Sequence, residues 1–335
     1  IIRVARQAGF QGVIIWQIEG QEHKRAAYYG EPRIVPYVAP EMDAIADEYF
    51  AKLRKAGLRV GVTIRPNIYF PLDAEGQPCA WDKLSKLKPR PWMAEIPERY
   101  RDVYGPEEAQ SPLARLDGKI TYAKKRWKCS LFYVDTNHFW RPRDRSQEKW
   151  GWKSKMLSAE VFRELAKRHP DVLIVPEHEY VKYWAYSAPY RQPPRWGGST
   201  PAGVRAAWPR AMSVISMNDA KHFSENIQHY AEAVKAGDSL LMNGWFGGRH
   251  VKVAQEIYGK ATADSALRLS LTTDSDLAEL RKLVQDGTAG KEWADRRVVI
   301  SYTPDARPRL QEAVDAVIDA GGVVAWTIET EKPGE

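Results

Sequence analysis

The feature that most constrains the fold is a set of short apolar runs, rich in β-branched residues, that recur along the whole chain. Each run holds four to six apolar residues and ends in polar ones. Because the apolar residues are continuous rather than alternating, the runs predict strands covered on both faces, as in a parallel sheet. Eight such runs occur, at residues 12–20, 59–67, 130–137, 172–179, 212–219, 239–245, 298–305 and 323–330.

Helical patterns separate these runs. The clearest begins at Pro40 and ends at Gly57, and Ile45, Tyr49 and Leu53 place an apolar residue at every fourth position between them. Proline at the start, glycine at the end and one apolar face are typical of an amphipathic helix. Comparable patterns cover residues 158–170, 224–238 and 307–322.

Strand and helix alternating eight times in 335 residues predict an α/β protein, a (β/α)8 TIM barrel formed by residues 1–335 as a single catalytic domain. Two stretches, at about 67–128 and 246–297, are too long for plain connections, and we expect them to be loop insertions over the C-terminal mouth. A doubly wound open sheet is the alternative. No G-x-G-x-x-G motif or P-loop follows any strand, which counts against it.

In such barrels the active site lies at the carboxyl ends of the strands. Two carboxylates end consecutive strands: Asp135 follows "LFYV" and Glu177 follows "LIVP". We therefore expect their side chains to be neighbours across the mouth. Hydrolysis of a glycosidic bond needs two carboxyl groups, one to attack the anomeric carbon and one to protonate the leaving oxygen. Neighbouring strands lie about 4.8 Å apart, which is compatible with the spacing of retaining enzymes.

The sequence also resembles a known group of enzymes. "FYVD" at the end of one strand, with a glutamate at the end of the next, resembles the arrangement in retaining barrel glycosidases, the α-amylase type and the endo-α-N-acetylgalactosaminidases. "APEMDAIADEYFAKLRKAGLRVGVTIRPN" is similar to the helix and strand that precede the nucleophile in such enzymes. The resemblance covers residues 10 to 180 and implies that Asp135 is the nucleophile and Glu177 the general acid/base.

Other polar and aromatic residues at the strand ends are candidates for substrate binding. Carboxylates, amides and aromatic rings with an arginine suit a neutral polyhydroxylated substrate better than a phosphate. The candidates are Trp16, Arg65, Asn137, His138, His178, Glu179, Asp219, Asn243, Trp245 and Trp326; Glu19, Asp305 and Glu329 are further carboxylates near strand ends.

Several of these residues have a simpler interpretation. Asp135 is also a common turn former, and Arg65 is also suited to an ion pair that keeps Asp135 ionised. Glu179 competes with Glu177 for the role of acid, because alternate strand residues share a side. Asp219 could cap the helix that follows it, and Trp245 and Trp326 could belong to the core.

Two other functions remain open. Asp135, His138, Glu177, His178 and Glu179 together offer ligands for a divalent metal, which would indicate a metal-dependent hydrolase or deacetylase acting on a carbohydrate. No H-x-H or HExxH spacing supports this reading. The second alternative is a non-catalytic barrel that only binds glycans. The main prediction, a glycosidase acting on an oligosaccharide, polysaccharide or glycoconjugate, needs no cofactor and no metal.

Composition excludes several partners. No apolar run approaches the ~20 residues of a membrane helix, and a net charge of +7 without a recognised motif gives little reason to expect nucleic-acid binding. Thirteen tryptophans and sixteen tyrosines, many beside polar residues, favour sugar binding. Cys79 and Cys129 leave the compartment open, with a secreted or periplasmic location slightly favoured over the cytoplasm. The chain begins "IIRVARQAGF", the pattern of a helix already under way, so we expect residues to precede it.

Overall fold

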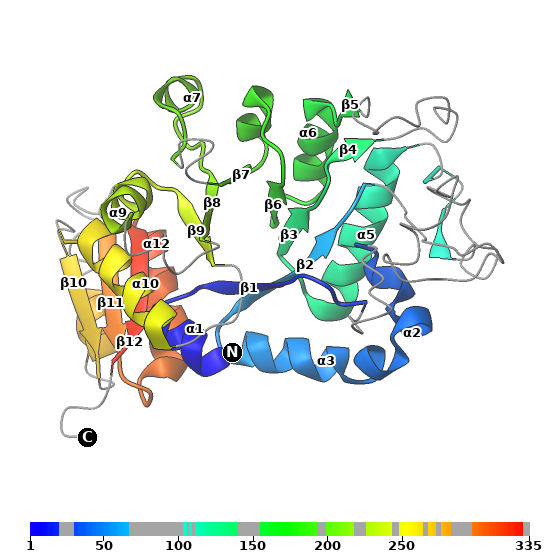
Figure 1. Cartoon of the computed structure of the whole chain (residues 1–335). Coiled ribbons are helices and arrows are strands. Elements are labelled where there is room, and N and C mark those ends of the chain that lie inside the picture. Colours follow the sequence, from blue (N-terminus) through cyan, green and yellow to red (C-terminus); the bar gives the residue numbers. More distant parts are fainter. Residues whose placement is uncertain are drawn as a thin grey trace. The chain divides into compact units, whose positions relative to one another are not determined.

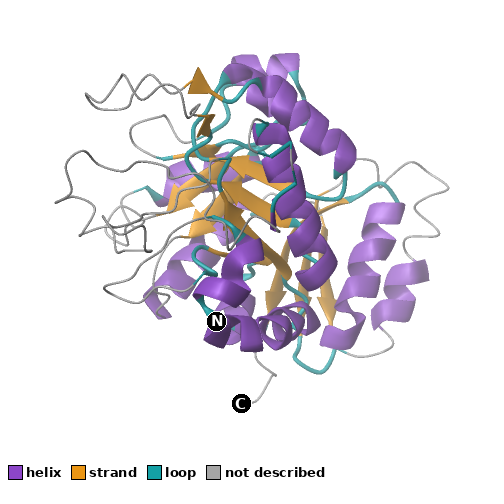
Figure 2. Cartoon of the chain, turned by 90° about the vertical axis from the view of Figure 1, so that its right-hand side faces the viewer, coloured by secondary structure: helices purple, strands orange, loops and turns teal. Residues whose placement is uncertain are grey.

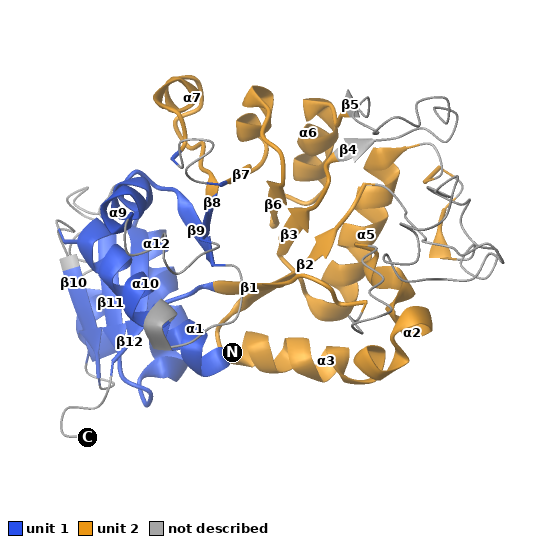
Figure 3. Cartoon of the chain, viewed as in Figure 1, with its two compact units in different colours: residues 1–11, 192–199, 215–335 blue, residues 12–191, 200–214 orange. Residues whose placement is uncertain are grey.

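The computed structural model describes residues 1–19, 30–66, 103–105, 107–108, 111–139, 155–192, 199–217, 226–242, 248–263, 267–272, 276–282 and 297–330 (Figure 1). The chain divides into two compact units (Figure 3). Unit 1 comprises residues 1–11, 192–199 and 215–335, and unit 2 comprises residues 12–191 and 200–214. None of the helices within the described ranges has the length and apolar character needed to cross a membrane.

Unit 2 is built on a parallel sheet of four strands in the order β1-β2-β3-β6. The strands are β1 (Gly12–Ile15), β2 (Arg59–Ile64), β3 (Leu131–Val134) and β6 (Leu173–Pro176). Helix α3 (Pro40–Lys55) connects β1 to β2, α5 (Pro112–Trp127) precedes β3, and α6 (Ala159–Arg168) precedes β6. Helices therefore flank the parallel strands, as Figure 2 shows in purple and orange.

The helix ends follow from local sequence. Pro40 and Pro112 occupy the first turns of α3 and α5, where a missing N–H costs nothing. The Ser111 hydroxyl accepts a hydrogen bond from the amide of Ala114 and caps α5. Ser158 caps α6 in the same way.

The core of this unit lies between the helices and the sheet. Helices α3 and α5 both pack against β2. The rings of Phe50 and Trp127 stack between these two helices with centroids 4.9 Å apart, and both side chains are almost fully buried. Burial of each such ring stabilises the fold by about 2–3 kcal/mol.

The remaining elements of unit 2 are short. They are η1 (Pro32–Ile34), α2 (Val35–Val38), the antiparallel pair β4 (His138–Phe139) and β5 (Lys155–Met156), η4 (Val181–Ala185), β7 (Tyr190–Arg191) and α7 (Ala202–Ala207). Trp184, Val204 and Ala211 form a small buried cluster beneath η4 and α7.

Unit 1 contains a second parallel sheet, β10-β11-β12, formed by Leu267–Leu271, Arg297–Tyr302 and Val323–Glu329. Its other elements are α1 (Ile2–Ala8), β8 (Val214–Met217, of which 215–217 lie in this unit), α9 (Ile227–Lys235), β9 (Ser239–Met242), α10 (Gly248–Ala261), η5 (Arg307–Arg309) and α12 (Leu310–Asp319). One apolar cluster joins α1, α9 and α10, and a second packs α12 on its sheet.

The α/β class predicted from the sequence is confirmed, and each of the eight apolar runs contains a strand. The range 246–297, expected to be an insertion, includes α10 and the additional strand β10, and the range 67–128 ends with α5. The described strands belong to separate sheets rather than to one closed ring. Closure into a single barrel domain of residues 1–335 thus stays a prediction.

Candidate active site

The carboxyl ends of β3 and β6 bring Asp135 and Glu177 side by side. The register pairs Val134 with Pro176, so the next residue of each strand also stands opposite the other. The ladder continues at this edge, since the amide of Asp135 donates to the carbonyl of Ile64 at 2.9 Å and the amide of Glu177 donates to that of Val134 at 3.0 Å. Both side chains therefore project from the same face of the sheet.

Asp135 is held by a cation and a hydroxyl. The Nε of Arg65, from the end of β2, forms an ion pair with Oδ2 of Asp135, and the two side chains are only 11% and 7% exposed. The hydroxyl of Thr136 donates to the same oxygen at 3.0 Å. These donors stabilise the charged carboxylate, the form a nucleophile requires.

Thr136 connects the two carboxyl groups. Its amide donates to Oε2 of Glu177 at 2.7 Å, while its hydroxyl binds Asp135. The backbone of Thr136 has φ of 49°, a left-handed conformation that β-branched residues rarely adopt. Such strain persists only where the surrounding contacts enforce it, and it is concentrated at functional sites.

The surroundings of Glu177 favour its protonated form. Burial and the neighbouring charge of Asp135 raise its pKa to about 7, although the Thr136 amide and Arg65 act in the opposite direction. A hydrogen bond to Asp135 is a smaller contribution to the same rise in the pKa. Asp135 is therefore paired with a cation, whereas the neighbouring Glu177 keeps its proton up to about neutral pH. This is the division of roles expected of a nucleophile or base and an acid.

Asn137 and His178 connect the two strand ends. The amide nitrogen of Asn137 donates to the carbonyl of His178 at 3.1 Å, and the amide of His178 donates to Oδ1 of Asn137 at 2.8 Å. Asn137 is fully buried, and its two hydrogen bonds fix the backbone next to Glu177. The ring of His178 is 46% exposed, with Nε2 3.5 Å from Oε2 of Glu177. Burial lowers the pKa of this ring, and the charge of Asp135 partly offsets the effect.

Glu179, the other candidate acid, has a different partner. Its Oε2 lies 2.7 Å from Nε of Arg191 in β7. Glu179 is thus engaged in an ion pair with a buried arginine. Glu177, whose pKa is raised, is the better candidate for the proton donor.

Aromatic rings cover the same face of the sheet below the carboxyl groups. Tyr133 precedes Asp135 by two positions and shares its side. The ring of Trp16 lies 4.6 Å from that of Tyr133, and the ring of Tyr190 lies 5.4 Å from it at a near-perpendicular angle. Trp16 is 37% exposed, so part of its apolar ring is open next to Tyr133.

Four other predicted binding residues fall where the structure says nothing of their side chains. Asp219, Asn243 and Trp245 lie outside the described residues, and His138 is described only as part of β4. Trp326 belongs to unit 1, where it is 5% exposed and stacks on Tyr258 with centroids 5.7 Å apart. A role for these residues in binding substrate stays a prediction.

Glu19 is near the end of β1 and has an unusual environment. Its side chain is buried, and Oε1 accepts a hydrogen bond from the amide of Glu31 at 2.5 Å. Burial raises the pKa of Glu19 to about 7. This buried position identifies Glu19 as part of the internal packing of unit 2 rather than as a group open to substrate.

The raised pKa of Glu19 predicts a pH-dependent stability. A carboxyl whose pKa rises on folding stabilises the folded state fully below pH 4.5 and loses that contribution as the pH rises through 7. Glu19→Gln is therefore expected to stabilise the protein at pH 8 relative to the parent, by about 3 kcal/mol at most. Urea unfolding at pH 5 and pH 8 measures this. Glu48→Gln, on an exposed position of α3, is the control, and an equal pH dependence in parent and Glu19→Gln would contradict the prediction.

Two sets of residues at or near the candidate site were not predicted. One is Thr136 with Tyr133, which join and underlie the carboxyl groups. The other is a buried set of charges, Glu31, Arg33, Glu108 and Lys119, of which Glu31 and Lys119 are 0% exposed. Within the described ranges, no group of three or more His, Cys, Asp or Glu side chains is arranged to hold a metal ion.

Comparisons with known proteins add the following. No protein family and no curated protein matches the sequence. Among solved structures, the chain is similar to the α-L-fucosidase AlfC from Lactobacillus casei in complex with α-L-fucose, with 15% identity, a TM-score of 0.39, and coverage of 79% of this chain and 78% of that one. It is also similar to an endocellulase from Pyrococcus horikoshii crystallised with cellotetraose, with 10% identity, a TM-score of 0.29, and coverage of 94% and 85%. The argument for a function therefore rests on the residues themselves.

Proposed function

We propose that the protein is a retaining glycoside hydrolase in which Asp135 is the nucleophile and Glu177 the general acid/base. The observation that carries the proposal is the contrast between two adjacent carboxyl groups. Asp135 is paired with a cation, and the pKa of Glu177 is about 7. A (β/α)8 barrel, of which the sheet β1-β2-β3-β6 would be one part, would place both groups at its mouth.

The reaction would proceed in two steps. In the first, a carboxylate oxygen of Asp135 attacks the anomeric carbon while Glu177 transfers its proton to the departing glycosidic oxygen, leaving a glycosyl ester on Asp135. In the second, the Glu177 carboxylate takes a proton from water, and the resulting hydroxide displaces Asp135 from the sugar. The proton returns to Glu177, so both groups end in their starting states.

One feature favours retention of configuration, and a second favours a sugar as the substrate. Asp135 and Glu177 follow paired residues of adjacent strands, which lie about 4.8 Å apart, whereas inverting enzymes hold their carboxyl groups about 6.5–9.5 Å apart to admit a water molecule. The exposed part of the Trp16 ring offers an apolar surface of the kind on which a sugar ring can stack. The substrate class proposed is accordingly an oligosaccharide, polysaccharide or glycoconjugate.

A panel of aryl glycosides tests the proposal. We expect at least one of them to be hydrolysed. NMR should show that the sugar first released has the same anomeric configuration as the substrate. Activity should persist in a chelator, because the carboxylate pair requires no metal. Release of the opposite anomer would contradict retention. Loss of activity in the chelator, restored by one divalent ion, would establish the metal-dependent alternative, and binding without turnover of any glycoside would establish a lectin-like protein.

The pKa of Glu177 also predicts the pH profile. As the acid of the first step, Glu177 must be protonated, so kcat/KM for natural glycosides is expected to fall tenfold per pH unit above about pH 7. Substrates whose aryl leaving groups depart as stable anions need less protonation. Their alkaline decline should be shallower, which serves as the internal control, and parallel profiles for both substrate types would argue against Glu177 as the acid.

A further inference from the structure

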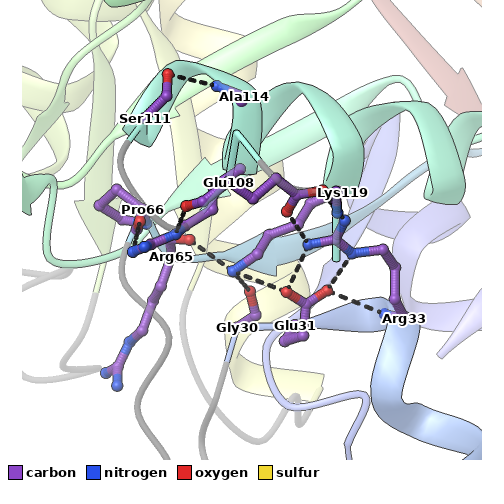
Figure 4. Close-up of polar contacts among 11 residues, drawn as sticks. Gly30, Glu31, Arg33, Arg65, Pro66, Glu108, Ser111, Ala114 and Lys119 are labelled. Atoms are coloured by element: carbon purple, nitrogen blue, oxygen red, sulfur yellow. Dashed lines mark hydrogen bonds and ion pairs between the residues drawn. The ribbon is translucent and has the colours of Figure 1, made fainter. Parts of the chain in front are cut away.

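A cluster of buried charges lies beside the end of β2 (Figure 4). Arg33 donates to both oxygens of Glu31, with Nε–Oε1 and Nη2–Oε2 distances of 2.8 and 2.9 Å, and to both oxygens of Glu108, at 2.8 and 2.7 Å. The ammonium of Lys119, from α5, lies 3.3 Å from Oε2 of Glu31. Removing charges from water is costly, and even well-paired buried ion pairs often add little net stability, which makes a purely stabilising role a weak explanation.

Lys119 makes its shortest contacts with backbone rather than with its ion-pair partner. Its Nζ donates to the carbonyl of Arg65 at 2.7 Å and to that of Gly30 at 3.0 Å. The amide of Arg65 in turn donates to the carbonyl of Gly30 at 3.0 Å. The backbone of Arg65 is therefore fixed at both its N–H and its C=O.

Two neighbouring features also restrict the backbone of Arg65 and Pro66. Gly30 has φ of 56°, and a methyl group added to it would lie 2.7 Å from both the amide nitrogen and Cγ of Arg65. Arg115 donates from Nη1 to the carbonyl of Pro66 at 3.2 Å. The carbonyls of residues 65 and 66 thus each receive a hydrogen bond from a buried cation, at the point where the Arg65 side chain leaves the strand to meet Asp135.

We propose that Lys119 is a positioning residue of the active site, which fixes the backbone of Arg65 so that the guanidinium stays on Asp135. The inference rests on the proposed roles of Asp135 and Glu177. Through Arg65, Lys119 controls how strongly Glu177 binds its proton, although Lys119 itself contacts neither carboxyl group.

The alternative is that Lys119 only neutralises Glu31. The charged groups that act on Lys119 are Glu31, Arg33 and Arg115, and it also influences Glu19. Those that act on Glu177 are Asp135 and Arg65, with His178 beside it. Lys119 is not among the strongest of these influences on Glu177, so we expect a change at Lys119 to reach Glu177 mainly by moving Arg65.

The test measures the titration of Glu177 directly. The side-chain carboxyl carbons are labelled with ¹³C, the Glu177 signal is assigned by its loss in Glu177→Gln, and its midpoint is followed by NMR. In Lys119→Met we expect the midpoint to rise by about half a unit to one unit, because Arg65 lowers the pKa of Glu177 and would move away. Lys124→Met, on the same helix in an exposed ion pair, should leave the midpoint unchanged.

Two further variants separate positioning from charge balance. The double variant Lys119→Met with Glu31→Gln removes both charges of this ion pair, while Arg33 keeps Glu108 as its partner, and it should keep the raised midpoint. Gly30→Ala alters no charge but pushes on Arg65, and it should raise the midpoint too. A parental midpoint in the folded double variant and in Gly30→Ala would overturn the proposal, whether or not the single Lys119 variant folds.

The outcome is also independent of the proposed activity. A raised midpoint in a protein that hydrolyses no glycoside would sustain the positioning role and remove the proposed function. An unchanged midpoint in a protein that does hydrolyse glycosides would remove the positioning role alone.

Discussion

Asp135→Asn is expected to lower kcat for every glycoside by about 10⁴-fold or more, because the amide that replaces the carboxylate is no nucleophile. The fold should survive. Asn has the same shape, and its Oδ1 can still accept from Nε of Arg65 and from the hydroxyl of Thr136. We expect the buried guanidinium to lose its charged partner at a cost of about 1–3 kcal/mol in the free energy of unfolding. Steady-state kinetics and urea unfolding measure the two effects.

The matched control is Asp171→Asn. Asp171 also forms an ion pair, with Nζ of Lys124 at 2.5 Å, but its side chain is 65% exposed. An exposed pair contributes little, so neither turnover nor stability should change measurably. A mechanism-based 2-deoxy-2-fluoro glycoside adds a positive readout, since mass spectrometry of peptides should find the sugar on Asp135. Parental turnover in Asp135→Asn, or a label on another residue, would contradict the assignment.

Several of the strands that could be predicted from sequence are buried along their length. Val60 to Ile64 in β2 and Val214 to Met217 in β8 are all buried, so both faces are covered and the apolar residues run on without interruption. Strand β10 was missed because it alternates: Arg268 and Ser270 are exposed, Leu269 is half-buried, and Leu271 is buried. One face of β10, with Leu269 and Leu271, therefore packs on the protein, while the other face, with Arg268 and Ser270, is exposed.

The pairing of Asp135 with Glu177 could be predicted for a different reason. In α/β proteins consecutive strands are usually neighbours, so two residues that end consecutive strands meet. The structure shows this, because the residues before them, Val134 and Pro176, are paired in adjacent strands. The catalytic roles proposed for them, in contrast, depend on charges and burial that no strand pattern encodes.

The rest of the site was out of reach because its partners are distant in the sequence or its conformation is disfavoured. Lys119 lies in the basic helix "PLARLDGKITYAKKRW", where the sequence does not distinguish it from the other lysines. Only the folded chain brings it to the carbonyls of Gly30 and Arg65. Thr136 adopts a left-handed backbone that its residue type argues against, so no propensity rule could have placed its amide on Glu177.

Glu177→Gln is expected to divide substrates by their leaving groups. Without a proton donor, natural glycosides should lose about 10²–10⁴-fold in kcat/KM. Aryl glycosides that release a stable phenolate should keep most of their first-step rate, because their departure needs little protonation. The amide of Gln can orient its oxygen towards the N–H of Thr136, so the turn that supports Asp135 should persist. Pre-steady-state bursts of phenolate, followed by slow turnover, would show accumulation of the glycosyl ester.

Azide then separates the two roles of Glu177. The second step normally needs a base to deprotonate water, but azide is already an anion and attacks the glycosyl ester unaided. Added azide should restore turnover of activated substrates in Glu177→Gln and release a glycosyl azide with the anomeric configuration of the substrate. Glu179→Gln is the matched control, because Glu179 is a neighbouring carboxylate held by Arg191 at 2.7 Å. If Glu179→Gln rather than Glu177→Gln shows the aryl-selective, azide-rescued pattern, the acid/base is Glu179, and Asp135 alone keeps its proposed role.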